Sequence, residues 1–233
     1  MTAAFNPWPM ATIRRINSIM LKAFALIALV ALSACSTAQP VTAPPEAIAA
    51  ARYVGDAPTS ITLYTVINNR NNNGAHSGIM INASQRVLFD PAGSWYHPSA
   101  PETNDLHYGF TPRMLSFYID YHARKSFRVV EQTYIVSPAT AELVLQRAAA
   151  YGAVPKAQCA NSLSKVLGGV PGFEAMTGTW YPNKLSEQFG TLPGVVSKTI
   201  RDEDADNNHG VLILQSKAEI AEAELAAQTA KAQ

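Results

Sequence analysis

Two side chains far apart in the sequence, Cys159 and His76, could together form a cysteine nucleophile. Cys159 opens a predicted helix that ends at Gly168-Gly169. First-turn N–H groups and the positive end of the helix dipole favour a thiolate over a thiol, and a nearby imidazole can take the thiol proton. The alternatives are that Cys159 is a small buried apolar residue, as most free cysteines are, and that His76 is an exposed histidine at the start of a strand.

Asp90 is the third candidate member of this site. His76 and Gly78 share one face of a predicted strand, where Gly78 leaves room for a helix end to approach. If residues 82–84 form a three-residue loop, the returning strand places Asp90 directly opposite His76. A carboxylate there could accept the imidazole N–H, hold its tautomer and raise its basicity. The alternative is that Asp90, which precedes Pro91, only begins a turn.

The elements that must position these residues indicate an α+β fold. Thr111 and Ser137 each precede a proline and predict helix starts, because a hydroxyl can cap the helix and proline fits its first turn. The predicted strands are 61–67, 76–81, 86–90, 127–135 and 210–214, and the predicted helices are 113–122, 139–151 and 157–167.

An irregular segment, 91–109, follows the predicted hairpin and is rich in proline, glycine and aromatic residues. Its side chains could wall a substrate groove or close the core beneath a long loop. The residues concerned are Trp95, Tyr96, His97, Tyr108 and Phe110.

The order of these features resembles the circularly permuted NlpC-type branch of the papain-like fold, which includes lecithin:retinol acyltransferase-like proteins. A histidine strand comes first, a second strand carries a polar partner, and a cysteine opens a helix far downstream. Ordinary papain-like enzymes have the cysteine helix before the histidine strand. The resemblance covers residues 61–167 and implies an antiparallel sheet packed against helices.

The resemblance implies that Cys159 is the nucleophile, His76 the base and Asp90 the third polar member of a site that transfers an acyl group through a thioester. Gln158 and Tyr64 are possible oxyanion or cleft residues, although Tyr64 could equally be an ordinary sheet tyrosine. The acyltransferase group has a histidine where this chain has Asp90, and its Asn-Cys-Glu motif is replaced by Gln-Cys-Ala-Asn. These departures point away from lipid acyl transfer specifically.

The first residues have the pattern of an export signal. An apolar run, 23–32, follows the basic residues Arg14, Arg15 and Lys22. The run carries no charge and is short for a membrane span. The following Leu-Ser-Ala-Cys resembles the bacterial lipobox, which implies a lipid on Cys35 and a membrane partner. An ordinary signal peptide with an incidental cysteine is the alternative. By resemblance to lipoprotein sorting, a serine after the cysteine favours the outer membrane, facing the periplasm.

Four parts follow from this pattern: a signal peptide over 1–34, an Ala/Pro/Thr-rich tether over 35–50, one domain over 51–215, and an Ala/Glu/Lys-rich tail over 216–233. The tail has high helix propensity but few large apolar residues, so we expect an exposed or frayed helix.

Composition and charge argue against several classes of ligand. The net charge is +1 and only 15% of the residues are charged, so no basic stripe exists to bind nucleic acid. Of the histidines at 97, 107, 122 and 209, only His107, near Asp105, and His122, near Asp120, have a possible ligand close in sequence, and no metal or cofactor is expected. The acidic run 202–208 lacks the glycine and the closing glutamate of a calcium loop, which favours a solvated loop.

The sequence therefore predicts a membrane-anchored thiol hydrolase of the cell envelope that acts on a peptidoglycan peptide or another amide. A lipid or acyl-ester hydrolase or transferase is the second hypothesis. A catalytically silent lipoprotein that uses the same scaffold for binding is the third.

Overall fold

The computed structural model describes residues 38–232 of the chain. The predicted signal peptide and the predicted lipidation site, Cys35, lie outside the described residues. Within residues 38–232, no helix combines the length and the hydrophobicity needed to cross a bilayer.

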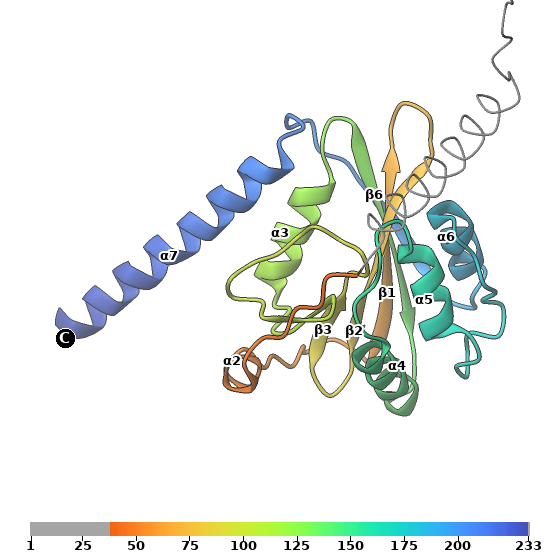
Figure 1. Ribbon diagram of the computed structural model, residues 1–233, viewed down its shortest axis with the longest axis horizontal. Coiled ribbons are helices and arrows are strands. Elements are labelled where there is room, and N and C mark those ends of the chain that lie inside the picture. The colour runs from red at the N-terminus through yellow and green to blue at the C-terminus, as the bar shows by residue number, and fades with distance from the viewer. Residues whose placement is uncertain (1–37, 233) are drawn as a thin grey trace, which may run out of the picture. The chain divides into compact units, whose positions relative to one another are not determined.

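The centre of the fold is an antiparallel sheet in the order β4-β5-β3-β2-β1-β6-β7 (Figure 1). Its long strands β1 and β6 are rich in β-branched and aromatic residues, which favour the pleated, half-buried environment of a sheet, and β2 between its partners contributes Ile79 and Ile81. The strands are β1 Ser60–Asn68, β2 Gly74–Asn82, β3 Arg86–Phe89, β4 Glu102–Thr103, β5 Leu106–His107, β6 Phe127–Ile135 and β7 Val196–Ile200.

Helices cover both faces of this sheet, so the predicted α+β class is confirmed. The helices α4 (Pro138–Tyr151), α5 (Cys159–Leu167) and α6 (Pro182–Gly190) pack on one face, and α3 (Pro112–His122) packs on the other (Figure 1). Two apolar cores result from the alternation of strand side chains. The first core contains Ile79 and Ile81 of β2, and the second contains Met80 of the same strand.

The two predicted helix caps are confirmed. The Thr111 hydroxyl accepts a hydrogen bond from the Met114 N–H, and the Ser137 hydroxyl accepts one from the Thr140 N–H. Each cap satisfies an N–H group that the first helical turn leaves without a partner. The caps thereby hold the starts of α3 and α4 at the residues that the sequence predicts.

The predicted strand 210–214 is wrong, because these residues belong to α7, Asn208–Ala232. A short apolar run does not distinguish a strand from a helix segment, and the helix-forming tail that follows continues the helical backbone through it. Leu212 is buried against the second core, whereas Leu214 is 67% exposed. The helix α6 and the strand β7 were not predicted.

The folded unit begins before the predicted domain boundary at residue 51. Thr42 forms a β-bridge with Thr103, and the Ala43 N–H donates to the Glu102 carbonyl. The short helix α2, Pro45–Ala50, follows. Residues 41–43 of the predicted tether thus bond to the β4 edge of the sheet.

Candidate active site

Cys159 is the first residue of α5, and this helix packs against β2. The predicted apolar face of the helix, with Leu163 and Val166, is buried in the first core. Just before the helix, Ala157 has a φ of 64°, a left-handed conformation that costs a non-glycine residue about 1–2 kcal/mol. This turn directs the chain into α5 and brings the Cys159 thiol, in a residue that is 6% exposed, against β2.

The thiol and the imidazole meet where β3 ends. His76 points to the α3 face of the sheet, whereas α5 packs on the opposite face. The β2–β3 ladder stops at the pair Ile79 and Phe89, so the first part of β2 has no β3 partner. The Ser77 N–H donates to the Cys159 sulfur, which also hydrogen-bonds with His76. The predicted proximity of Cys159 and His76 therefore depends on the short length of β3.

Asp90 contacts His76 as predicted, but in a different register. The distance from His76 Nε2 to Asp90 Oδ1 is 2.6 Å. The hairpin loop is residues 83–85, with Asn82 paired to Arg86, so the same register, extended one residue beyond the last pair, places Asp90 opposite Gly78. The predicted direct pairing of Asp90 with His76 is wrong by two residues. The contact survives because a shift of two keeps every side chain on its own face, and the two groups meet on the diagonal.

Gly78 makes space for this contact. A Cβ atom at Gly78 would lie 2.7 Å from the Tyr118 hydroxyl and 2.9 Å from Asp90 Oδ1. The prediction that a helix end occupies this space is therefore wrong. A carboxylate and a phenol occupy it instead.

Tyr118 is a member of the site that the sequence did not indicate. Its hydroxyl donates to Asp90 Oδ1 at 2.8 Å, and the residue is fully buried. One carboxylate oxygen thus accepts from both Tyr118 and His76. Tyr118 has the helical spacing of a core residue on α3, with Met114 four residues before it, so no local signal separates it from an apolar packing residue.

His76 and Asp90 each stabilise the charged form of the other. Burial alone would raise the pKa of Asp90, but the charge and hydrogen bond of His76 lower it to about 2. Burial alone would lower the pKa of His76, but Asp90 and the Cys159 thiolate raise it to about 10. The imidazole is therefore protonated at neutral pH.

The imidazolium in turn favours the thiolate. Burial raises the pKa of Cys159, but the hydrogen bond and the charge of His76 lower it. The N–H groups of Ser77 and Ala160 act in the same direction, so the net pKa of the thiol is lowered. Nε2 of His76 is bonded to Asp90, which leaves Nδ1 for exchange of a proton with the sulfur.

His122 lies beside the base. Its ring is stacked on that of His76, with centroids 5.6 Å apart and an interplanar angle of 9°. His122 Nδ1 lies 2.9 Å from the Tyr118 carbonyl, which can only accept, so Nδ1 carries the proton. Burial lowers the pKa of His122 to about 4, so the ring is neutral and Nε2 is an acceptor.

The two other candidate residues, Tyr64 and Gln158, have different surroundings. Tyr64 is 1% exposed in the second core, where its hydroxyl contacts Met80 Sδ at 3.9 Å. Its ring packs edge-on against that of Tyr118, and its backbone pairs with Gly78 in the β1–β2 ladder. Gln158 precedes α5, and its side-chain oxygen accepts a hydrogen bond from Asn161 at 3.4 Å.

The irregular segment mostly closes the core. Trp95, His97 and Phe110 are buried, whereas Tyr96 is 50% exposed. Trp95 packs edge-on against Phe110 and Tyr118. Of the two predicted roles for these aromatic residues, packing under a loop describes the buried members.

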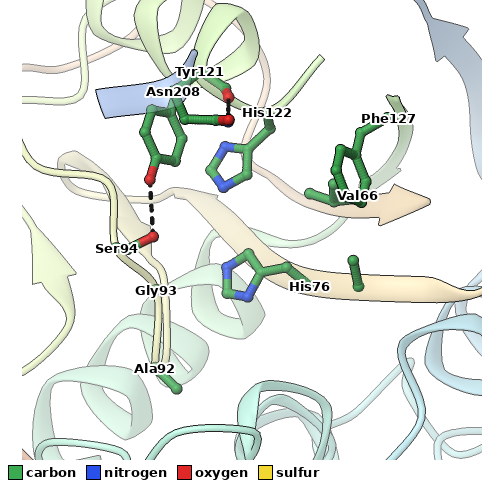
Figure 2. Close-up of a pocket in the computed structure, with 10 residues that line it drawn as sticks. Val66, His76, Ala92, Gly93, Ser94, Tyr121, His122, Phe127 and Asn208 are labelled. Carbon is green, nitrogen blue, oxygen red and sulfur yellow. Dashed lines mark hydrogen bonds between the residues drawn. The ribbon is translucent and has the colours of Figure 1, made fainter. Parts of the chain in front are cut away.

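A cavity of about 420 Å³ adjoins His76 (Figure 2). Ser94, Tyr121 and Asn208 provide polar groups on one side of it, and Val66 and Phe127 provide apolar surface on the other. The remaining lining residues are Ala75, Ala92, Gly93 and His122. The volume is within the range of small-molecule sites in proteins.

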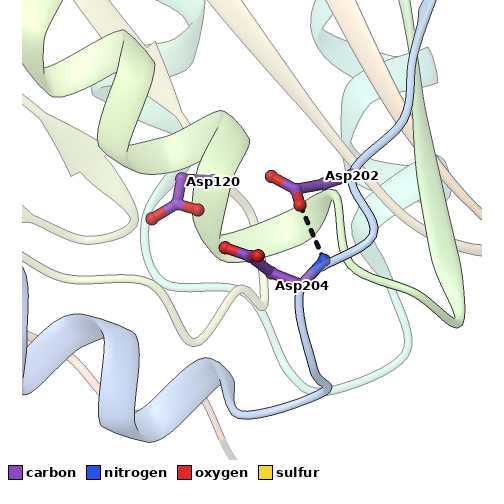
Figure 3. A group of neighbouring side chains, drawn as sticks. All are labelled: Asp120, Asp202 and Asp204. Atoms are coloured by element: carbon purple, nitrogen blue, oxygen red, sulfur yellow. Dashed lines mark hydrogen bonds between the residues drawn. The ribbon is translucent and has the colours of Figure 1, made fainter.

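A second group of side chains, Asp120, Asp202 and Asp204, lies apart from this site (Figure 3). Arg124 pairs with Asp120 at 2.5 Å and with Asp204 at 3.3 Å. Because one guanidinium pairs with two of the three carboxylates, we interpret the group as an ion-paired acidic loop.

The described residues thus bring Cys159, His76 and Asp90 together, add Tyr118 and His122, and leave Tyr64 in the core. No family model, curated protein or solved structure matches the chain significantly. The chemistry of the site is therefore argued from its own geometry.

Proposed function

We propose that the protein is a thiol hydrolase that cleaves an amide, such as a bond in a peptidoglycan peptide, through a thioester on Cys159. The observation that supports this proposal is the chain of contacts from the Cys159 thiol through His76 to the buried Asp90 carboxylate. A thiolate–imidazolium pair held by a carboxylate is the arrangement that activates a cysteine nucleophile.

Three further parts of the proposal rest on the sequence. The sheet and helices would form a permuted papain-like fold, with the histidine strand before the cysteine helix. A lipid on Cys35 would anchor the protein in the bacterial outer membrane, facing the periplasm. The substrate would then be a cell-wall peptide or a related acyl compound of the envelope.

Acylation would begin with attack of the thiolate on the amide carbonyl. A C–S bond forms, and the oxyanion is stabilised by N–H groups at the start of α5, including that of Cys159. When the C–N bond breaks, the leaving nitrogen takes the proton of His76, and an acyl thioester remains on Cys159.

Deacylation would reverse the proton transfers. Water gives a proton to His76 and attacks the thioester carbonyl, after which the C–S bond breaks. The products are a carboxylic acid and the thiolate–imidazolium pair. Asp90 keeps its charge throughout and holds the imidazole through Nε2.

Alkylation of Cys159 by iodoacetamide at pH 6 tests the proposal. An ordinary thiol has a pKa of about 8.5 and is almost wholly protonated at this pH. Because His76 lowers the pKa of Cys159, we expect Cys159 to react faster than such a thiol. We expect His76→Ala to slow the reaction at least about tenfold, since the adjacent cation is lost.

Two results would contradict the proposal. One is alkylation at pH 6 no faster than that of a cysteine peptide, with no effect of His76→Ala. The other is unchanged amide hydrolysis by Cys159→Ala. The first would make Cys159 a structural cysteine and favour the catalytically silent lipoprotein.

A further inference from the structure

We infer that the cavity beside His76 receives the leaving group of the substrate, or the acceptor that replaces it, as an uncharged group that carries a carboxamide or a hydroxyl. This inference rests on the proposed function and adds the chemical class that the site selects. It predicts discrimination against a free carboxylate at the same position.

The position of the cavity assigns it to the leaving side of the reaction. His76 lines the cavity, whereas Cys159 is not among the described residues that line it. In the proposed reaction the acyl carbon bonds to the Cys159 sulfur, and the departing group takes its proton from His76. A cavity that borders the imidazole therefore faces the atoms that leave, and by reversal the atoms of an incoming acceptor.

The lining indicates an uncharged occupant. None of the described lining residues is Arg, Lys, Asp or Glu, and His76 is already paired with Asp90 and Cys159. A carboxylate that entered would find no cation left to compensate its lost hydration, and an ammonium would find no lining anion. Placing either ion there is unfavourable, whereas a neutral polar group needs only hydrogen bonds.

The cavity offers both a donor and an acceptor. Ser94 Oγ and the Tyr121 hydroxyl are 2.9 Å apart, so one hydroxyl donates its proton to the other. The hydroxyl that accepts keeps its own proton, which it can donate to a ligand. His122 Nδ1 is used by the Tyr118 carbonyl, which leaves Nε2 to accept. A carboxamide or a hydroxyl matches this pair, because each can accept one hydrogen bond and donate another.

The apolar side of the cavity completes the fit. Val66 and Phe127 lie across from the Ser94–Tyr121 pair (Figure 2), and Ala75 adds further apolar lining. They can cover the short carbon frame that bears the polar group. A small amino-acid amide or a sugar-like hydroxyl compound combines these features.

Acceptor competition during turnover of an acyl-enzyme tests the inference. p-Nitrophenyl acetate would acetylate Cys159 and release a burst of nitrophenol, and an added amine would then take the acetyl group from the thioester. Glycinamide and glycine form a matched pair, because glycinamide carries a carboxamide where glycine carries a carboxylate. At equal concentrations of unprotonated amine, we expect glycinamide to be preferred at least about tenfold.

Two variants connect this preference to the cavity. Ser94→Ala and His122→Leu should each reduce the ratio of glycinamide to glycine transfer at least about fivefold, because each removes one hydrogen-bonding group. Ser84→Ala, at an exposed serine in the β2–β3 loop, is the matched control and should keep the ratio.

The nitrophenol burst distinguishes a failure of the proposed function from a failure of the inference about the cavity. Absence of a burst from the unmodified protein would overturn the proposed thiol chemistry. A normal burst with equal transfer to glycine and glycinamide, or a preference that Ser94→Ala and His122→Leu both leave unchanged, would overturn the inference about the cavity alone.

Discussion

The Asp90 carboxylate is the residue on which the geometry of the candidate site depends. Its side chain is fully buried, and one oxygen accepts hydrogen bonds from both His76 and Tyr118. The Tyr118 bond restrains the same carboxylate oxygen that contacts the base. In the proposed reaction Tyr118 would therefore act through Asp90, as a positioning residue.

Tyr118→Phe should keep the fold but hold Asp90, and with it the His76 imidazole, less firmly in place. Loss of a hydrogen bond to a charged group lowers the free energy of unfolding by about 1.5–3 kcal/mol. We expect a value at the lower end of this range, because His76 still bonds the same oxygen. We expect alkylation of Cys159 at pH 6 to slow about threefold to tenfold and its pH profile to move upward. Denaturant unfolding and the pH dependence of alkylation measure the two effects.

Tyr64→Phe is the matched control for this prediction. Tyr64 is equally buried and packs against the Tyr118 ring, but its hydroxyl contacts only a methionine sulfur. A shift of the alkylation profile in Tyr64→Phe as large as that in Tyr118→Phe would mean that core packing, rather than the Asp90 bond, positions the base.

At the scale of elements, the site depends on where β3 ends and on a glycine in β2. The end of β3 at Phe89 lets the Cys159 thiol on one side of the sheet reach an imidazole on the other. Gly78 then admits the carboxylate and the phenol on the histidine's face. Both features concern how strands pack, and neither involves a group that reacts.

Gly78→Ala should disrupt this arrangement with one added methyl group. The new Cβ would lie under 3 Å from both Asp90 Oδ1 and the Tyr118 hydroxyl, so at least one of them must move. Overpacking of this kind costs about 1–3 kcal/mol. We expect a lower midpoint of denaturant unfolding together with slower alkylation of Cys159 at pH 6.

Gly178→Ala provides the control, because no atom lies within 4 Å of a Cβ built there. It should leave both measurements close to those of the unmodified protein. Equal effects of the two substitutions would show that loss of glycine itself, and not the crowding at Asp90, is responsible.

Elements with a complete local signal were predictable from the sequence. The capped helices α3 and α4 begin at Thr111 and Ser137 as expected, since a hydroxyl cap followed by proline acts within one turn. The residues 210–214 were not predictable, because four apolar residues fit either a strand or a helix and the helical context decided.

At the scale of the whole molecule, the buried ion pair links the site to stability. The pKa of Asp90 falls from 3.8 to about 2 on folding, so its contribution is present above pH 3.8 and is lost as the pH falls through about 2. The pKa of His76 rises from 6.5 to about 10, so its contribution is complete below pH 6.5 and is lost as the pH rises through about 10.

His76→Gln should therefore destabilise the protein most between pH 3.8 and 6.5. In this variant Asp90 remains buried without a cation, which costs about 3–5 kcal/mol. The free energy of unfolding is measured against pH in a Cys159→Ala background, so that the thiol does not titrate. His209→Gln, at an exposed histidine of α7, is the control. Parallel pH profiles for the two variants would contradict the ion pair.

The proposed anchor also concerns the whole molecule. Cys35→Ser should abolish incorporation of labelled fatty acid and release the protein from membranes, because in this proposal Cys35 carries the lipid. Metabolic labelling followed by membrane fractionation measures both. Cys159→Ser, which changes the other cysteine, should remain labelled and membrane-bound. Unchanged labelling of Cys35→Ser would eliminate the lipoprotein proposal.

The sequence by itself determined what local chemistry and periodicity can determine. It identified Cys159 at a helix start, His76 on a strand, Asp90 on the same face, and the α+β class. Each depends on residues within one element or one hairpin, where backbone geometry sets which side chains share a face. The predicted register was two residues off, and the contact survived because faces repeat every two residues.

Only the tertiary structure decided which distant side chains complete the site. Tyr118 and His122 come from α3. The Cys159 thiol reaches His76 from the opposite face of the sheet because β3 ends at Phe89. These contacts depend on how helices dock on the two faces of a sheet. The packing of two cores sets that arrangement, and no spacing of residues along the chain encodes it.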